Sequence, residues 1–491
     1  MAKRLERSVD WGTRLHGPTI SYAFADKGEK IASPMGKIAS VGLNHYEKSQ
    51  FKLAFELYAS FADLKFQRVK HAGSADLVIA TYRDDSTTLG AMEPPGWGTA
   101  RGHGVFNHDG IGWDEDQPGA GALEQGGFGF ITVIHELGHG LGLAHPHDRG
   151  GDSTLFPGVS SSSDLGKFAL NQGVWTVMSY NDGWQTNPEG MPPEYAAYGF
   201  EGTPMAIDIA VLQDKYGANE EFHRGANTYR LPTANDVGTY YSCIWDAGGR
   251  DKIVAPGDVG ATINLQAATL KAEPGGGGFV SSVDGILGGF TIAHRVTIEN
   301  ARGGGGDDAI TGNASSNRLA GRAGDDVVDG RGAADTLRGG ADADVLHGGR
   351  GADRLDGGTG YDILSGGRGA DRLDGGSGGG SLTGGSGADT FLFGSPPGDG
   401  GVTTVTDFAP RHDVIALSAA GFAALGGSGS LRAASFAAGT SAVDASDRII
   451  YDPASGALRY DPDGIGDAPA TTFALLTPGL HLNHAHFVIV G

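Results

Sequence analysis

The feature that most constrains the fold of this chain is a glycine-rich repeat of nine residues. It runs over residues 303–392 as ten copies in unbroken register, and each copy approximates G-G-x-G-x-D-x-U-x, where U is a large apolar residue. Repeats of this kind form parallel β-helices or rolls, in which each copy adds one short strand and stacking buries a continuous core. A disordered linker of glycine and aspartate is the alternative. Such a linker would not need the apolar residue that recurs in every copy. We therefore predict an all-β parallel roll over these residues.

The aspartates at the sixth position of the copies are candidate calcium ligands. One inward apolar residue per copy buries too little area to offset the entropy of ordering the backbone. Ca²⁺ prefers six to eight oxygen ligands, and glycine-rich turns offer carbonyl oxygens beside the carboxylates. The repeat resembles the repeats-in-toxin nonapeptide, which implies several structural calcium ions. The candidate ligands, expected to be most effective between Asp335 and Asp371, are Asp308, Asp326, Asp335, Asp344, Asp353, Asp362, Asp371 and Asp389.

A second strong feature is the string H-E-x-x-H-x-x-G-x-x-H at residues 135–145. On a helix, His135 and His139 project from one face a turn apart, as two ligands of a tetrahedral Zn²⁺ require. Glu136 can act as general base on a zinc-activated water without occupying the metal. Gly142 lets the backbone leave the helix, so that His145 can become the third ligand. Three neutral imidazoles leave one position for water, which suits amide hydrolysis.

This string, followed by Trp-Thr-Val-Met-Ser-Tyr at residues 175–180, resembles the serralysins, which are secreted bacterial metzincins. The resemblance implies that Met178 forms the hydrophobic floor beneath the zinc, the Met-turn, and is not a ligand. It also implies that Tyr180 coordinates zinc or hydrogen-bonds the transition state. Pro146 and Asp148 match the family's H-P-x-D sequence. Taken alone, the Val-Met-Ser-Tyr run is more typical of a core strand.

The resemblance extends over nearly the whole chain. Residues 203–219 resemble the helix that closes the family's catalytic domain, and residues 244–251 resemble the turn before the roll, where Asp246 and Asp251 are candidate calcium ligands. An acid-rich turn without calcium is the alternative there. Residues after the roll resemble a C-terminal β-sandwich. The last six residues, 486–491, resemble an uncleaved signal for a type I exporter, and a buried terminal strand is the competing interpretation.

Apolar periodicity in the first part of the chain predicts a mixture of helices and strands. Alternation predicts strands over residues 19–24, 64–69 and 76–82, and helical spacing predicts a helix over residues 43–61. Residues 89–92 are expected to form either an edge strand that binds peptide by β-addition or an ordinary structural strand. The predicted fold class is an α/β (α+β) zincin-like catalytic domain followed by an all-β parallel β-roll and a C-terminal β-sandwich. The expected domains span residues 1–220, 221–392 with the lead-in segment, and 393–491 with the export signal.

Charge and composition restrict the partners and the cellular location. A formal net charge of −22 disfavours nucleic acid and anionic membrane as partners and suits a chain that binds cations. The single cysteine, Cys243, excludes a disulfide framework, and no apolar stretch is long enough to span a membrane. The first seven residues are not followed by the apolar region of a signal peptide. We expect an extracellular monomer, secreted without an N-terminal signal peptide and not inserted in a membrane.

Together these motifs predict a secreted, serralysin-like zinc metalloendopeptidase. It would use one catalytic Zn²⁺ and several structural Ca²⁺, hydrolyse protein or peptide substrates, and fold its roll only when calcium is bound. Two alternatives stay open. One is a non-proteolytic repeats-in-toxin calcium-binding surface or adhesion protein with a vestigial protease domain. The other is a zinc hydrolase acting on a substrate that is not a peptide.

Overall fold

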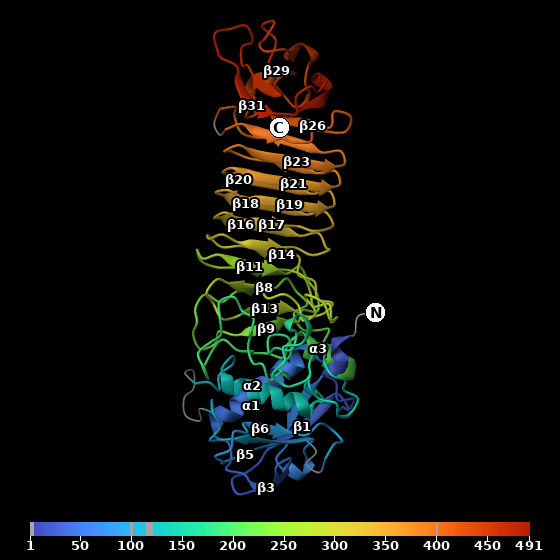
Figure 1. The fold of residues 1–491 in the computed structure, drawn as a ribbon, viewed down its shortest axis with the longest axis vertical. Coiled ribbons are helices and arrows are strands. Elements are labelled where there is room, and N and C mark those ends of the chain that lie inside the picture. The colour runs from blue at the N-terminus through green and yellow to red at the C-terminus, as the bar shows by residue number, and fades with distance from the viewer. Residues whose placement is uncertain (1–3, 99–101, 114–120, 399–400) are drawn as a thin grey trace. The chain divides into compact units, whose positions relative to one another are not determined.

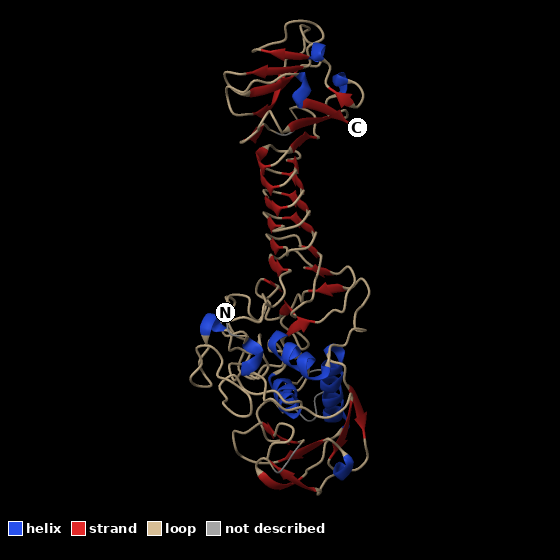
Figure 2. Ribbon diagram, turned by 90° about the vertical axis from the view of Figure 1, so that its right-hand side faces the viewer, coloured by secondary structure: helices blue, strands red, loops and turns tan. Residues whose placement is uncertain are grey.

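The chain folds into two compact units, seen in a computed structural model that describes residues 4–98, 102–113, 121–398 and 401–491 (Figure 1). The first unit comprises Met1–Asn227, Leu231–Asp251 and Gln266–Thr297. The second comprises Thr228–Arg230, Lys252–Leu265 and Ile298–Gly491. Among the described residues, strands far outnumber helices, and Figure 2 shows the long helices in the first unit. This agrees with the predicted order of an α/β N-terminal part followed by a β-rich C-terminal part.

The first unit is built on a five-stranded sheet of order β4-β1-β5-β7-β6. Strand β6 lies at the sheet edge and pairs antiparallel with β7, while β1 pairs parallel with both β4 and β5. A hairpin of β2 and β3 and a parallel pair of β9 and β13 complete the main strand pairings of this unit. The strands are β1 (Thr19–Phe24), β2 (Lys30–Ser33), β3 (Gly36–Ala39), β4 (Lys65–Arg68), β5 (Leu77–Tyr82), β6 (Gly90–Met92), β7 (His103–Asn107), β9 (Tyr241–Ile244), β12 (Ser282–Val283) and β13 (Gly289–Ile292).

Three α-helices accompany this sheet: α1 (His45–Phe61), α2 (Phe128–Gly140) and α3 (Ala206–Tyr216). The side chain of Asn44 accepts a hydrogen bond from the backbone N–H of Glu47, and the Glu47 carboxylate accepts one from Asn44, so a capping box begins α1. The buried face of α1 follows helical spacing, and Phe51 packs edge to face on Phe106 of β7. Nearly every residue of α2 is buried, because this helix lies between α1 and strands β6 and β7.

In the second unit, successive strands alternate between two parallel sheets. Each strand pairs with the strand 18 residues further on, as the register Leu337↔Leu355↔Leu373 shows. The apolar position of every copy from Ile310 to Phe391 is at most 2% exposed, so one residue per strand forms the core between the sheets. The first sheet contains β8 (Thr228–Arg230), β10 (Lys252–Val254), β14 (Asn300–Arg302), β16 (Arg318–Ala323), β18 (Thr336–Ala341), β20 (Arg354–Thr359), β22 (Arg372–Asp374), β24 (Thr390–Phe393), β26 (Val414–Ser418), β32 (Phe487–Val490) and β27 (Gly429–Ser430).

The second sheet of this unit continues into the C-terminal strands in the same way. Antiparallel pairs appear only past the repeats among the described strands of this sheet, where β30 pairs with β29 and β31. The sheet contains β11 (Ala261–Asn264), β15 (Ala309–Thr311), β17 (Val327–Asp329), β19 (Val345–Arg350), β21 (Asp362–Arg368), β23 (Gly380–Ser386), β25 (Thr403–Val405), β31 (Thr471–Leu475), β30 (Ala457–Tyr460), β29 (Ile449–Asp452) and β28 (Phe436–Ala438). Short 3₁₀ helices lie at Leu5–Ser8, Ala72–Ser74, Lys167–Ala169, Ala423–Leu425, Ala433–Ser435 and His484–His486.

Most elements expected from periodicity are confirmed. The predicted strands and helix of residues 19–82 correspond to β1, α1, β4 and β5, and the helix expected within residues 203–219 is α3. The core-strand alternative for the Val-Met-Ser-Tyr run is wrong, because residues 175–180 form turns. The terminal segment forms β32, in which Phe487 and Ile489 are buried, as its competing interpretation expected. Within the described residues, no helix has the length and apolarity needed to cross a membrane.

The buried apolar residues of the roll, one in each strand, should contribute more to the free energy of unfolding than its outward-facing residues. Leu346→Ala removes a fully buried side chain from β19 and should lower the free energy of unfolding by about 2–5 kcal/mol. The matched control is Ile363→Ala on the neighbouring β21, whose side chain faces outward and is 46% exposed, and its cost should be below about 1 kcal/mol. Chemical denaturation at a fixed calcium concentration measures both values. Equal losses would contradict a core made of these buried residues.

Candidate active site

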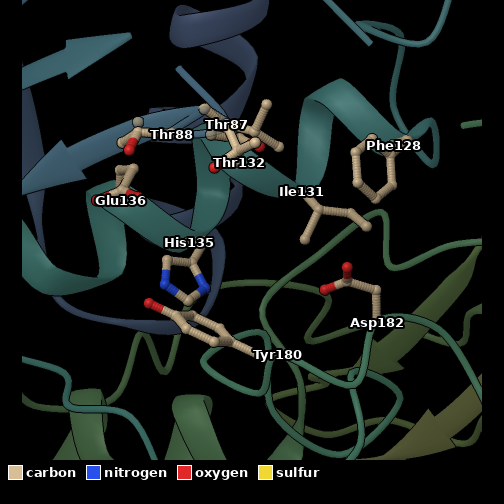
Figure 3. A pocket seen from close by; sticks show the side chains of 11 residues that line it. Thr87, Thr88, Phe128, Ile131, Thr132, His135, Glu136, Tyr180 and Asp182 are labelled. Atoms are coloured by element: carbon tan, nitrogen blue, oxygen red, sulfur yellow. The ribbon is translucent and has the colours of Figure 1, made fainter. Parts of the chain in front are cut away.

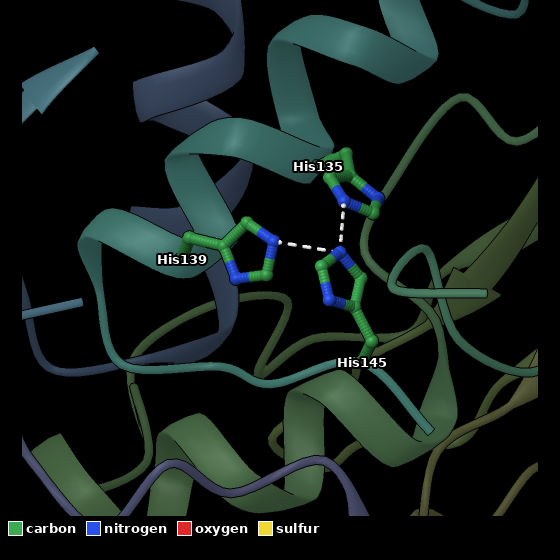
Figure 4. A group of neighbouring side chains, drawn as sticks. All are labelled: His135, His139 and His145. Atoms are coloured by element: carbon green, nitrogen blue, oxygen red, sulfur yellow. Dashed lines mark hydrogen bonds between the residues drawn. The ribbon is translucent and has the colours of Figure 1, made fainter. Parts of the chain in front are cut away.

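Three histidine side chains converge at the C-terminal half of α2 (Figure 4). His135 and His139 project from adjacent turns of the helix, and His145 approaches from the segment that follows it. The Nε2 atom of His145 lies 3.1 Å from Nε2 of His135 and 3.0 Å from Nε2 of His139. A tetrahedral zinc with bonds of about 2.0–2.1 Å requires ligand nitrogens roughly 3.4 Å apart. The three nitrogens therefore form a donor set that fits zinc.

A hydrogen bond at the opposite ring nitrogen orients each imidazole. The Nδ1 atom of His135 lies 2.7 Å from the carbonyl oxygen of Val177, and Nδ1 of His139 lies 3.0 Å from that of Leu143. The Nδ1 atom of His145 lies 2.8 Å from Oδ2 of Asp148. Because an acceptor faces each Nδ1, that nitrogen carries the proton and Nε2 presents its lone pair to the centre of the group.

Burial keeps these rings neutral. Burial first, and the neighbouring histidines second, lower the pKa of His135 and of His139 to about 3. Burial also lowers the pKa of His145 to about 4, against the opposing hydrogen bond to Asp148. A metal ligand must be deprotonated, so rings that stay neutral across the physiological pH range are ready to bind an ion.

The chain leaves α2 through Gly142, which has a φ of +100°. A side chain at this position would clash, since an added Cβ would lie 2.2 Å from the carbonyl oxygen of Thr13. Glycine accepts this backbone conformation at little cost and thereby ends the helix three residues before His145. The sequence-based explanation for the position of His145 is supported by this geometry.

Glu136 faces a cavity of about 380 Å³ next to the three histidines (Figure 3). Burial raises the pKa of Glu136 to about 8, and a hydrogen bond from the backbone of Met92 opposes the rise. Strand β6 runs close to this side chain, because an added Cβ on Gly90 would lie 2.8 Å from Cγ of Glu136. The edge strand and the carboxylate therefore border the same cavity.

Met178 lies directly beneath α2 and is fully buried. A Cβ added to Gly138 would lie 2.9 Å from its sulfur atom. Asp208 on α3 fixes the turn that carries Met178: its carboxylate accepts hydrogen bonds from the Thr176 hydroxyl at 2.6 Å and from the Val177 backbone at 2.8 Å. The Asp208 side chain thus connects α3 to the floor of the site.

Tyr180 lies beside the histidines at the end of the same turn. Its ring centroid is 4.7 Å from that of His145 and 5.7 Å from that of His135. Partial burial, followed by the charge of Glu136, raises the pKa of Tyr180 to about 12. The phenol therefore keeps its proton at neutral pH and can donate a hydrogen bond.

The aspartates of the repeats are buried in two stacks along the roll, with each at most 2% exposed. In each stack, one carboxylate oxygen accepts a hydrogen bond from the backbone of the residue 18 positions earlier. Examples are Oδ1 of Asp344, which accepts from Asp326 at 3.0 Å, and Oδ1 of Asp353, which accepts from Asp335 at 2.8 Å. The second oxygen has no hydrogen-bond partner among the described residues at Asp326, Asp335, Asp344, Asp353, Asp362 and Asp371. Buried oxygens of this kind fit calcium coordination.

The other candidate calcium residues have different surroundings. Asn317 replaces aspartate in one copy, and its amide group donates to the carbonyl of Glu299 and accepts from Asn313. Asp246 accepts a hydrogen bond from the backbone of Gly248 at 2.9 Å, and Asp251 accepts one from Asn227 at 2.7 Å. Asp246 and Asp251 are both buried. They belong to the first unit, whereas the repeat aspartates belong to the second.

Sequence reasoning missed three carboxylates around this site: the buried Glu201 and Asp208, and the partly buried Asp182. Burial raises the pKa of Asp208 to about 6, that of Asp182 to about 7 and that of Glu201 to about 8. Asp208 occupies the third position of α3, which identifies it as a capping residue. Nothing in the sequence links it to residues some thirty positions earlier. Asp182 and Glu201 lie in irregular segments, where no periodicity marks a buried side chain.

Two family models match consecutive parts of the chain. The matrixin model matches residues 39–173, and the model described as "Peptidase M10 serralysin C terminal" matches residues 216–426. The chain belongs to the serralysin family. Serralysins are also among its similar relatives. Serralysin from Proteus mirabilis is 30% identical over 319 residues, which is 61% of this chain and 60% of the relative. Serralysin C from Dickeya chrysanthemi is 32% identical over 325 residues, which is 63% of this chain and 62% of the relative.

A third relative of this serralysin-family chain is the metallopeptidase AprA from Pseudomonas marginalis. It is 30% identical over 316 residues, which is 61% of each chain. The chain thus spans about 60% of the length of the relatives that it matches. Membership of the family implies a catalytic zinc, and the three histidines provide a donor set for it.

The hydrogen bond between Asp148 and His145 generates a prediction about metal affinity. Asp148→Asn weakens the acceptor that orients the His145 ring, so zinc affinity should fall about 10–100-fold. Competition with a zinc chelator of known affinity measures the change. The control is Asp85→Asn, which removes an exposed carboxylate of the same unit and should leave the affinity unchanged. Equal affinities of the Asp148 variant and the parent chain would show that this contact does not support the metal.

Proposed function

We propose that this serralysin-family chain is a secreted zinc-dependent endopeptidase that hydrolyses proteins. The observation that carries the proposal is the convergence of three neutral histidine Nε2 atoms beside a buried glutamate in a cavity. The names of the relatives, serralysin and metallopeptidase, support the same activity. The alternative of a calcium-binding protein with a vestigial protease domain has less support, because ligands, base, Met-turn and tyrosine are all present in one site.

In this proposal His135, His139 and His145 hold the zinc. A bound zinc lowers the pKa of water and polarises a peptide carbonyl. Glu136 takes the proton from the attacking water and delivers it to the nitrogen of the leaving amine, so the proton count balances across the reaction. The phenol of Tyr180 donates a hydrogen bond to the oxygen on which negative charge develops, while Met178 supports the histidines from below. A substrate peptide lies along the free edge of β6, which borders the cavity.

The calcium part of the proposal rests on the unpaired oxygens of the repeat aspartates. Six of these oxygens are buried without a protein partner in the described residues, and burial raises the pKa of Asp326, Asp335 and Asp344 to about 7. Calcium would compensate for this burial in a parallel β-roll. Asp308 and Asp389 at the ends of the roll, and Asp246 and Asp251 before it, are further candidate ligands. We propose that at neutral pH the roll folds only when calcium is bound.

The proposed division into domains follows these roles. The catalytic domain spans residues 1–220, the lead-in and roll span 221–392, and a β-sandwich with the export signal spans 393–491. The chain would act outside the cell as a monomer after passage through a type I exporter. The terminal residues 486–491 would then serve both as the signal and, after folding, as strand β32.

The role of Glu136 gives a direct test of the enzyme. Glu136→Ala should retain zinc, since the three histidines remain. Its rate of peptide hydrolysis should fall by more than the factor of ~10²–10⁴ that one general base supplies. Casein digestion and metal analysis measure the two properties on the same sample. The control is Glu56→Ala on the exposed face of α1, which should keep parental activity. A zinc-loaded Glu136 variant with parental activity would refute the mechanism. A zinc-loaded parent chain that digests no protein would favour the non-proteolytic alternatives.

Calcium removal gives a test with a defined pH dependence. The raised pKa values of the repeat aspartates mean that the calcium-free fold is stabilised while these groups are protonated. This stability is lost as pH rises from about 4 through about 7. In excess chelator the full chain should keep more β-signal in circular dichroism at pH 5 than at pH 8, and added calcium should restore the signal at pH 8. A roll that stays fully folded in chelator at pH 8 would contradict calcium-dependent folding.

A further inference from the structure

The cavity beside Glu136 contains a second carboxylate, that of Asp182. Figure 3 shows this side chain at the far side of the cavity from Glu136, with its oxygens turned towards Ile131. Asp182 stands two residues after Tyr180, in the segment that follows the Met-turn, and it is partly buried. The cavity therefore has the proposed general base at one end and a separate acid at the other.

Asp182 has no structural partner that accounts for its charge. Among the described residues, its carboxylate accepts no hydrogen bond and forms no ion pair, and its one hydrogen bond is made by the backbone carbonyl, which accepts from Gln185. No lysine or arginine is found among the described residues that line the cavity. A partly buried carboxylate that faces a cavity without a counter-charge favours a cation that enters the cavity.

The remaining walls suit the stem of a long side chain. Phe128 and Ile131 give one apolar wall along α2, and Thr132 stands beside them. Lysine and arginine combine an apolar stem with a charged head, and they bury the stem while the head keeps a polar partner.

We propose that this cavity is a specificity subsite that binds a lysine or arginine side chain of the substrate, with Asp182 as the residue that selects the positive charge. The inference rests on the proposed function, because the cavity adjoins Glu136 and the edge strand β6. The basic residue therefore flanks the scissile bond. Selection by charge at this position directs the enzyme to basic segments of its protein substrates.

The test compares peptides that carry lysine or norleucine at each of the two positions on either side of one cleaved bond. Norleucine matches the lysine stem and lacks the charged head. At one of these positions, kcat/KM should favour lysine at least about tenfold, and in Asp182→Asn the lysine-to-norleucine ratio should fall to near one. Mass spectrometry of the products identifies the bond. The control is Glu189→Gln, an exposed acid of the same segment, in which the ratio should keep its parental value.

A ratio near one in the parent enzyme, or a lysine preference that survives in Asp182→Asn, would overturn the inference. Circular dichroism checks that the variant is folded, and Asp182→Ser provides a second neutral substitution. A binding measurement separates this result from failure of the proposed function. Calorimetry with zinc-loaded Glu136→Ala gives the dissociation constants of the same peptides without hydrolysis. The parent chain could bind these peptides and still cleave none of them, which would refute the proposed function. In that case, tighter binding of the lysine peptide that is lost when Asp182 is also replaced supports the inference. Equal binding of both peptides overturns it.

Discussion

Burial of ionisable groups without protein counter-charges is the constraint that unites the parts of this chain. His135 and His139 in α2 are buried and His145 after the helix is partly buried, and the lone pairs of the three neutral rings are turned towards one another. The repeat aspartates are buried with one oxygen each left without a hydrogen bond at six positions among the described residues. Polar groups of this kind are costly in a protein interior unless they gain a partner. Both units therefore offer donor groups that fit bound cations.

The two units use different means to hold these groups in place. In the first unit, orientation comes from long-range contacts: Asp208 fixes the Met-turn from α3, and the carbonyl of Val177 in that turn accepts a hydrogen bond from Nδ1 of His135. In the second unit, orientation comes from repetition, since each repeat aspartate from Asp326 to Asp389 accepts a hydrogen bond from the backbone of the residue 18 positions earlier. The first arrangement positions one ion among several different side chains. The second offers the same environment many times along a stack.

The sequence predicted the elements whose pattern is local, and it missed contacts between distant residues. Periodicity located β1, α1, β4 and β5, and the histidine spacing located α2 and the turn at Gly142. The run at residues 175–180 gave a wrong alternative, because a short apolar stretch does not distinguish a strand from a buried turn. Asp182 and Glu201 were not identified, since their burial results from how irregular segments pack. The roles of the predicted ligands and of Glu136 remain predictions that the geometry supports.

The alternation of strands between two sheets limits how the roll can change in length. Since each copy of nine residues crosses to the other sheet, a deletion of one copy would move every later strand to the opposite sheet. Outward-facing residues of β20 and β22, such as Arg354 and Arg372, would then take positions in the other sheet that residues such as Ile363 occupy now. Removal or addition of two copies preserves every sheet assignment. The identical nonapeptides at residues 348–356 and 366–374 stand one such double step apart. The roll can therefore lengthen or shorten only by pairs of copies, that is, in steps of 18 residues.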